Sequence, residues 1–243
     1  MRQLLPAPEA EFDVEELLSR VDRTPPQGRP WVMANMVMSV DGAYSVAGRS
    51  RGLASPADRQ VFHTLRAAAD VVLVAAGTAR QERYGRPATW PELLEPRRRM
   101  GLTDSPRLAV ISRSAHVPED QPFLDGDGPV PLLLHPDGAA LTAVPQGVEP
   151  RVAGRGVDVD LHEALAGLRA DGAEQVMCEG GPTLLGQLHL ADLVDELFVT
   201  ISPQLVGGTA LGLLGPVPES PRRFALHRAL EDGGNLLLTY RRA

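Results

Sequence analysis

The segment "EGGPTLLGQ" holds residues whose types and spacing could bind an anion. Gly180 and Gly181 follow the apolar run 173–177 and precede a predicted helix over 182–190. A strand-to-helix corner without side chains presents free backbone N–H groups and the positive end of a helix, which favours phosphate. The same residues also fit an ordinary tight turn with glycines at positive φ, and on this segment alone the turn is the simpler interpretation.

Two further corners carry comparable chemistry. The run "DVVLVA" is followed by Gly77 and Thr78, and the run "RLAVIS" leads into Ser112, Arg113 and Ser114. Gly77 allows a close backbone approach, and two hydroxyls around a guanidinium suit a phosphate monoester. Ligands of open parallel sheets bind outside the carboxyl ends of the strands, so the three corners predict one elongated, multiply phosphorylated ligand. A dinucleotide fits, and the Ser-Arg-Ser corner indicates a 2′-phosphate and hence NADPH, although no G-x-G-x-x-G fingerprint follows an early strand.

Two acids are candidates for substrate chemistry. Asp41 ends the segment "MSVD" at the predicted carboxyl end of a strand, and Glu179 precedes the glycine pair. We expect both carboxyl groups to bind a polar substrate. Burial should raise the pKa of whichever one donates a proton. The sequence does not decide between them, and an Asp-Gly turn is an equally good interpretation of Asp41.

Alternating strands and helices must position these residues. The pattern predicts a short helix within the N-terminal arm 1–28 and a single domain over 29–243. Ser55 and Asp58 form a capping box, with Phe62, Leu65 and Ala69 on the buried face of the helix that follows. The segment 83–106 is predicted as a long surface loop that could cover a site. The other expected elements are strands at 31–40, 70–75, 107–112, 130–135, 173–177 and 195–208, helices at 55–69, 161–172 and 182–190, and a closing hairpin across 231–234.

Strands that are apolar on both faces and alternate with helices predict an α/β fold. The central sheet should be mainly parallel, with helices on both faces and an antiparallel C-terminal hairpin. The strand at 195–208 would be an exposed apolar edge in a monomer, which predicts a homodimer.

Composition excludes several classes of function. The 243 residues carry a net charge of −7 with a pI near 5.4, which argues against nucleic acid and membrane as partners. All 24 basic residues are Arg, so Schiff-base and P-loop lysine chemistry is excluded. The single Cys178 and six scattered histidines predict neither a disulfide nor a metal site. No signal peptide or apolar run of about 20 residues is present, so a cytoplasmic location is expected.

Four segments in this order resemble the reductase family of riboflavin biosynthesis: "NMVMSVDG", "SPADRQVFHTLRAAADVVLVAAGT", "VMCEGGPTLLGQL" and "LVDELFVTISPQLVGG". The resemblance covers residues 30 to 241 and is greatest to a stand-alone actinobacterial branch called pyrimidine reductases. It implies a dihydrofolate reductase-like fold, a homodimer, and NADPH-dependent reduction of the ribose of 5-amino-6-(5-phosphoribosylamino)uracil to ribitol. It also implies a cis peptide between Gly180 and Gly181.

The resemblance implies roles for individual residues. Substrate contacts are implied at Ser50, Arg66, Asp41 and Glu179. Cofactor contacts are implied at Met38, Gly52, Thr78, Glu82, Ser112, Gly181, Pro182, Thr183, Leu184, Leu185, Gly186 and Gln187.

The chain departs from the family at two positions, since Ala43 and Gly52 stand where the family usually has Lys and Trp. A pterin such as dihydrofolate is therefore an alternative substrate, and a non-catalytic NADPH-binding protein is an alternative of another class. The segment "GRSRG" matches a G-x-S-x-G hydrolase motif, but the residues before it predict a loop rather than the strand that a nucleophile elbow needs. The zinc deaminase motifs that often accompany the family have no counterpart in this sequence.

Overall fold

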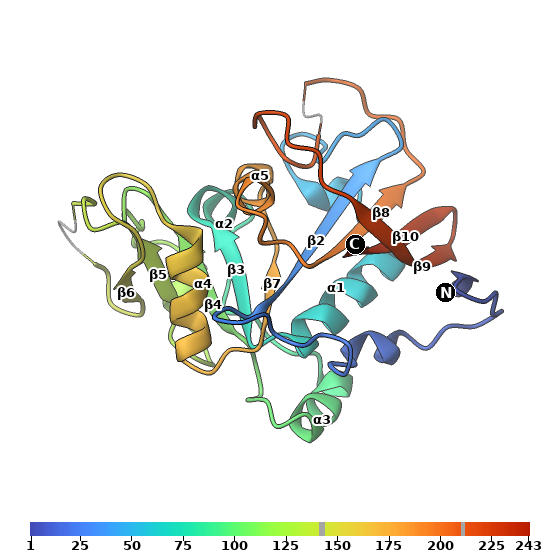
Figure 1. Ribbon diagram of the computed structural model, residues 1–243, viewed down its shortest axis with the longest axis horizontal. Coiled ribbons are helices and arrows are strands. Elements are labelled where there is room, and N and C mark those ends of the chain that lie inside the picture. Colours follow the sequence, from blue (N-terminus) through green and yellow to red (C-terminus); the bar gives the residue numbers. More distant parts are fainter. Residues whose placement is uncertain (141–143, 210–211) are drawn as a thin grey trace.

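The computed structural model describes residues 1–140, 144–209 and 212–243, and it forms one mixed sheet with helices on both faces (Figure 1). In these residues the sheet has ten strands, in the order β1-β9-β10-β8-β2-β7-β3-β4-β5-β6. The strands are β1 (Arg2–Leu5), β2 (Trp31–Ser39), β3 (Val71–Ala75), β4 (Arg107–Ile111), β5 (Leu132–His135), β6 (Glu149–Val152), β7 (Gln175–Cys178), β8 (Glu196–Ser202), β9 (Phe224–Asp232) and β10 (Asn235–Arg242). The helices are α1 (Pro56–Ala68), α2 (Ala76–Gln81), α3 (Pro91–Arg99), α4 (Leu161–Ala170) and α5 (Pro182–Leu190), with 3-10 turns η1 (Val14–Leu18), η2 (Ser50–Gly52) and η3 (Pro122–Leu124).

The strands from β8 through β6 all pair in parallel, whereas β10, β9 and β1 add antiparallel pairs. The parallel strands are covered on both faces, which is why β3 and β7 are almost wholly apolar. The predicted fold class, a mainly parallel sheet with an antiparallel C-terminal hairpin, is confirmed.

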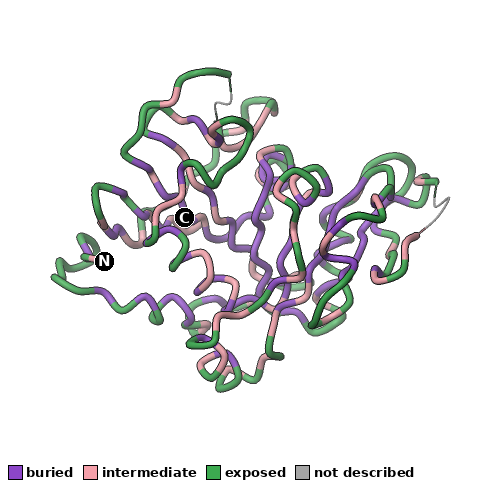
Figure 2. Tube along the Cα trace, turned by 180° about the vertical axis from the view of Figure 1, so that it is seen from behind, coloured by how far each residue is buried: buried purple, intermediate pink, exposed green. Residues whose placement is uncertain are grey.

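Helices divide between the two faces of the sheet. α4 and α5 pack on one face against Val32, Ala34 and their neighbours, and α1 packs on the other face against Met33. The buried trace runs through the middle of the molecule (Figure 2). α1 begins where the sequence predicts, because the Ser55 hydroxyl accepts the backbone N–H of Asp58 at 3.0 Å. Its buried face differs from the prediction, since Phe62 is only half-buried.

β8 lies inside the sheet between β10 and β2, because the hairpin β9–β10 returns beside it. The prediction of an exposed edge strand at 195–208 is therefore wrong, and the argument for a homodimer that rested on it is lost. The sheet ends instead in β1 and β6, which have four residues each. Short edge strands discourage pairing with another chain.

The N-terminal arm is part of the same core. β1 pairs with β9, and Phe12, Val14 and Leu17 pack against α1 and the sheet. The buried Arg23 donates to Glu196 at 2.7 Å and to the Leu17 carbonyl at 2.8 Å. The helix predicted in the arm is a single 3-10 turn, η1.

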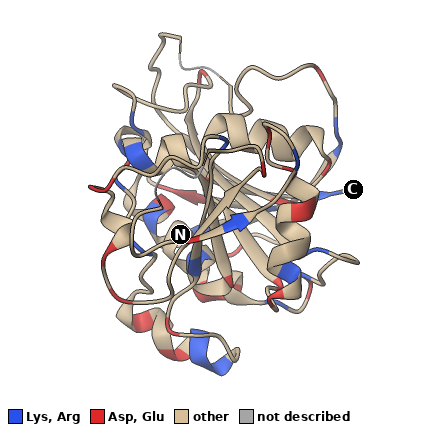
Figure 3. Cartoon of the chain, turned by 90° about the vertical axis from the view of Figure 1, so that its left-hand side faces the viewer, with Lys and Arg blue, Asp and Glu red and all other residues tan. Residues whose placement is uncertain are grey.

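The segment 83–106 is not one long loop, because it contains α3. Arg97 is buried in α3 and donates to the carbonyls of Ala67 and Ala69 at 2.9 and 2.6 Å, which caps the end of α1. α3 lies at the end of the sheet where β3 begins, with acidic residues early and basic residues late along the helix (Figures 1 and 3). That order complements the helix dipole.

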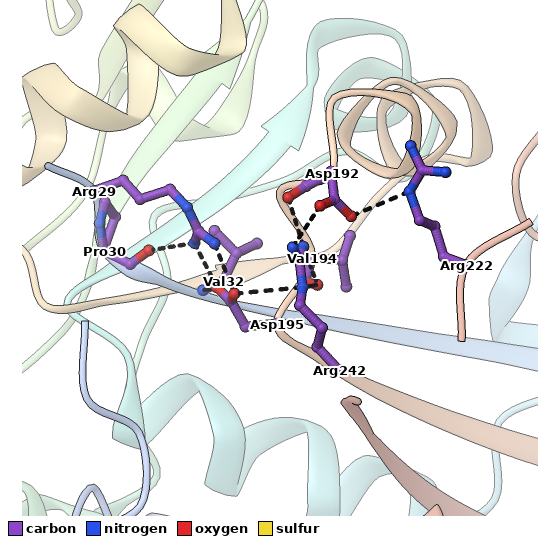
Figure 4. A network of polar contacts seen from close by, with 8 residues as sticks. All are labelled: Arg29, Pro30, Val32, Asp192, Val194, Asp195, Arg222 and Arg242. Carbon is purple, nitrogen blue, oxygen red and sulfur yellow. Dashed lines mark hydrogen bonds and ion pairs between the residues drawn. The ribbon is translucent and has the colours of Figure 1, made fainter. Parts of the chain in front are cut away.

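A polar network joins the starts of β2 and β8 to the end of β10 (Figure 4). Asp195 accepts two bonds from the Arg29 guanidinium, at 2.5 and 2.7 Å, and one from the Val32 N–H at 2.8 Å. Arg242 donates to Asp192 at 2.8 Å. The network therefore fixes this end of the sheet, opposite to the carboxyl ends of β2 and β8.

Candidate active site

A cleft of about 1250 Å³ lies at the carboxyl ends of β2, β3, β4 and β7. Small-molecule pockets usually measure about 300–1,000 Å³, so this cleft has room for two ligands side by side. Of the residues predicted for the site, the following line it: Ser50, Arg66, Gly77, Thr78, Glu82, Ser112, Arg113, Glu179, Gly181, Pro182, Thr183, Leu184 and Gln187. Six do not: Met38, Asp41, Gly52, Gly180, Leu185 and Gly186.

We divide the cleft into two halves. The β4 half is lined by the corners after β3 and β4 and by the first turn of α5. The α1 half is lined by α1, the loop over 44–51, Tyr84 and Glu179. The three corners predicted from the sequence therefore meet in the β4 half.

Backbone groups dominate the β4 half. α5 begins at Pro182 after Gly181, and no side chain caps it. The N–H groups of Thr183 and Leu184 consequently lack partners within the helix. A Cβ at Gly181 would lie 2.6 Å from the Thr78 hydroxyl, whereas a Cβ at Gly77 would meet no atom within 4 Å. A side chain at position 181 would therefore disturb the protein's own packing, while Gly77, which lines the cleft, has open space where a Cβ would stand.

Arg113 supplies a cation at the mouth of the β4 half. Its guanidinium lies 3.8 Å from Asp158, and both side chains are exposed. An exposed pair at this distance is weak, so Arg113 is free to reorient toward an anion in the cleft.

A buried ionic cluster closes the floor of the α1 half. The Arg66 guanidinium donates to both carboxylate oxygens of Glu179, at 2.6 and 2.7 Å, and the Tyr84 hydroxyl donates to Oε2 at 2.8 Å. Burial raises the pKa of Tyr84, and the Glu179 charge raises it further. Burial alone would lower the pKa of Arg66, but Glu179 more than reverses this. Arg66 and Tyr84 therefore hold the Glu179 carboxyl group from two sides.

The loop over 44–52 is tied to the end of α2. Glu82 accepts the Ser50 N–H at 3.1 Å and the Ser50 hydroxyl at 3.3 Å. Ser50 therefore stands on a 3-10 turn and faces a carboxylate, which is not a hydrolase elbow. Gly52 does not line the cleft, and a Cβ there would lie 2.9 Å from the Val46 Cβ.

Asp41 does not take part in the cleft, contrary to the sequence-based expectation. It is exposed and accepts bonds from the Ser39 hydroxyl at 2.5 Å and the Gly207 N–H at 2.7 Å. These bonds, with one from the Val206 N–H, lower its pKa to about 2. The structure gives no support to a proton-donating role for Asp41, because the expected burial is absent and hydrogen bonds lower the pKa of its carboxyl group.

The sequence matches the RibD C-terminal domain over residues 30–238. The chain belongs to this family. The resemblance to the reductases of riboflavin biosynthesis is thus confirmed, and the Gly180–Gly181 peptide is cis as that resemblance implies.

One curated relative and two solved structures are similar to this RibD C-terminal domain. A curated relative from Methanothermobacter thermautotrophicus is 32% identical over 74% of this chain and 81% of its own length, and is named 2,5-diamino-6-ribosylamino-4(3H)-pyrimidinone 5′-phosphate reductase. A pyrimidine reductase-like protein from Corynebacterium diphtheriae shares the fold, with a TM-score of 0.82 and 23% identity over 96% of this chain and 99% of its own. A Thermotoga maritima deaminase and 5-amino-6-(5-phosphoribosylamino)uracil reductase also shares it, with a TM-score of 0.74 and 18% identity over 88% of this chain and 57% of its own.

Several residues that line the cleft of this RibD domain were not singled out from the sequence as site residues. Asp58 and Phe62 are two of them, and they line the cleft from α1 at four-residue spacing with Arg66, which was predicted. His63 lies beside them, stacked on Trp90 at 4.0 Å, and burial followed by the Arg66 charge lowers its pKa to about 4. The polar and aromatic residues at positions i, i+4 and i+8 were the available signal, because that spacing puts them on one helix face.

Other chemistries find little support in the described part of the chain. Burial raises the pKa of Cys178 to about 12, so its thiol is not a nucleophile at neutral pH. Within residues 1–140, 144–209 and 212–243, no group of three or more His, Cys, Asp or Glu side chains could hold a metal ion. Over the same residues, no helix has the length and apolar character to cross a membrane.

Proposed function

We propose that this protein is an NADPH-dependent reductase of a phosphorylated ribosylaminopyrimidine in riboflavin biosynthesis. The proposal rests on one observation, a single cleft that joins an uncapped helix start and open glycine corner to a buried Arg66–Glu179–Tyr84 cluster. The Methanothermobacter thermautotrophicus relative, which is 32% identical to this chain and is named as a reductase, supports the proposal.

The β4 half fits a dinucleotide phosphate. Thr183 and Leu184 would bind pyrophosphate through their N–H groups, and the Thr78 hydroxyl stands beside them. Ser112 and Arg113 would hold the 2′-phosphate. The open space at Gly77 is a cradle that a Cβ would partly fill. A bound reduced nicotinamide supplies the hydride.

The α1 half would hold the substrate. Ser50 and the Arg66–Glu179 pair line it together with Phe62, whose ring has the Arg66 guanidinium over one face at 4.2 Å from its centroid. Ala43, where the family usually has Lys, is fully buried and does not line the cleft. The exposed Arg51, Arg59 and Arg80 at the cleft are the cations available to the substrate phosphate in its place.

The chemistry requires hydride addition to C1′ of the ring-opened sugar imine and a proton for the imine nitrogen. The protein's part is to orient the two ligands and to exclude water, which accounts for much of the rate in such reactions. Glu179 is fully engaged by Arg66 and Tyr84, so we assign it to positioning rather than to proton donation. Homodimer formation stays a prediction of the family resemblance alone.

The direct test is to incubate the protein with NADPH and each of three candidate substrates, and to identify products by mass. The substrates are the diaminopyrimidinone 5′-phosphate, its uracil counterpart, and dihydrofolate. We expect NADPH oxidation with a ribosylaminopyrimidine and a product heavier by two hydrogens. Turnover of dihydrofolate alone would replace the proposal with a pterin reductase, and binding of NADPH without any turnover would make the protein a non-catalytic binder.

A further inference from the structure

Tyr84 lines the α1 half of the cleft, and the proposed function gives it no task beyond its bond to Glu179. Glu179 also lines the cleft, but its side chain is only 1% exposed, whereas that of Arg66 is 15% exposed and Tyr84 is half-buried. The Tyr84 hydroxyl and the Arg66 guanidinium both donate to the Glu179 carboxyl group. A ligand in the α1 half therefore meets Arg66 and Tyr84 before it meets that carboxyl group.

The bond to Glu179 determines what Tyr84 offers to a ligand. A phenol hydroxyl carries a single proton, and here the proton is donated to Glu179 Oε2 at 2.8 Å. Within the described residues, no group donates to the Tyr84 oxygen. Toward the cleft, Tyr84 is consequently a hydrogen-bond acceptor and not a donor.

Arg66 supplies a donor beside this acceptor. Its Nε and Nη2 are bonded to Glu179, while its Nη1 has no partner among the described residues and is not enclosed by other atoms. The guanidinium carbon lies 4.2 Å from the Phe62 ring centroid and 5.7 Å from that of Tyr84, and such contacts restrict its movement. A donor next to an acceptor matches a sugar hydroxyl, which both donates and accepts. A phosphate dianion can only accept, so it matches the pair less well.

The position of Glu179 in the chain places these two groups where the halves of the cleft meet. Glu179 directly precedes Gly180 and Gly181, the corner that the proposed function assigns to the cofactor. A hydride that passes from cofactor to substrate crosses this junction. The sugar hydroxyl nearest to the carbon that receives it, C1′, is the hydroxyl on C2′.

We infer that Tyr84 determines sugar specificity by accepting a hydrogen bond from the 2′-hydroxyl of the substrate, while Arg66 Nη1 donates to the same oxygen. The inference rests on the proposed function and adds to it a residue that recognises the sugar. A sugar without this hydroxyl leaves both the Tyr84 acceptor and the Arg66 donor without partners, which weakens binding.

A cycle of two changes tests the inference, with Tyr84→Phe in the protein and loss of the 2′-hydroxyl in the substrate. We expect the wild type to reduce the 2′-deoxyribosyl analogue of the diaminopyrimidinone 5′-phosphate about a hundredfold less efficiently than the ribosyl compound, by kcat/KM. In Tyr84→Phe this ratio should fall to about tenfold or less, because only the contact with Arg66 remains. A merely structural role of Tyr84 would lower kcat/KM for both compounds alike and leave the ratio unchanged.

Three controls accompany the cycle. Tyr240→Phe is the same substitution in β10, outside the cleft, and should leave the ratio as in the wild type. Melting curves of Tyr84→Phe with and without NADPH should show a folded protein that the cofactor still stabilises, since the β4 half is untouched. Equilibrium binding of the ribosyl and 2′-deoxyribosyl compounds to the protein without cofactor repeats the cycle independently of turnover.

The outcomes separate the inference from the function beneath it. A ratio that is the same in the wild type and Tyr84→Phe, or a wild type that reduces both compounds equally well, would overturn the role of Tyr84 while the reductase stands. A binding preference for the ribosyl compound that falls in Tyr84→Phe, with neither compound reduced, would support the role of Tyr84 and contradict the proposed function.

Discussion

The two halves of the cleft are built in different ways. In the β4 half, glycine corners and the free N–H groups of α5 offer recognition through the backbone, and Arg113 is the exposed exception. In the α1 half, recognition depends on buried side chains, with Glu179 held by Arg66 and Tyr84. A change at the exposed Arg113 in the first half should therefore act on ligand affinity alone, whereas a change at the Arg66–Glu179 pair in the second should act on folding as well.

The largest effect is expected at the buried pair. Arg66→Met leaves the Glu179 carboxylate buried without its cation, which typically costs about 3–5 kcal/mol of folding stability. Urea unfolding measures this directly. Arg113→Met in the other half should change stability by less than about 0.5 kcal/mol, because that side chain is exposed. Similar losses of unfolding free energy in the two variants would show that the two halves do not differ in this way.

Gly181→Val should weaken NADPH binding about a hundredfold, or roughly 2.7 kcal/mol, because the new side chain blocks approach to the start of α5. The same side chain also meets the Thr78 hydroxyl, so stability will fall too. Thr78→Ala removes that hydroxyl together with a proposed cofactor contact, so the Thr78→Ala single variant is the reference for both stability and NADPH binding. In the Thr78→Ala background, we expect Gly181→Val to recover thermal stability but not the stabilisation by NADPH. Recovery of both would mean that Gly181 serves packing alone.

Arg113→Ala should narrow the preference for NADPH over NADH by about ten- to a hundredfold, since a hydrogen bond to a charged group contributes roughly 1.5–3 kcal/mol. Fluorescence titration with both cofactors measures the ratio. Arg155→Ala removes another exposed arginine, outside the cleft, and is the control. Equal affinities of the wild type for NADPH and NADH would contradict the proposal that Ser112 and Arg113 hold the 2′-phosphate.

The smallest effect concerns Asp41, outside both halves. Its folded-state pKa of about 2 lies below the ordinary 3.8, so its contribution to stability is present above pH 4 and is lost as the pH falls toward 2. Asp41→Asn should therefore lower the melting temperature slightly at pH 7 and not at pH 2. Melting curves across this range test it, and a difference that persists at pH 2 would assign the effect to something other than the charge.

Features that depend on local sequence could be predicted, and features that depend on tertiary packing could not. The local sequence around Gly180 and Gly181 predicts a turn between a strand and a helix. The bounds of that helix, α5, were predicted correctly at 182–190. Asp41 and Asp58 both looked like local turn or cap residues, and only tertiary packing buries the second and exposes the first. The position of β8 inside the sheet could not be predicted either, because it depends on whether the hairpin β9–β10, later in the chain, pairs beside β8.

The most direct test of the proposed function is isotope tracing. The protein is supplied with NADPH deuterated at the transferable position and with the diaminopyrimidinone 5′-phosphate, and the product is analysed by NMR. The account predicts one deuterium at C1′ of the new ribityl chain. Deuterium on the heterocycle, or none in the product, would contradict it.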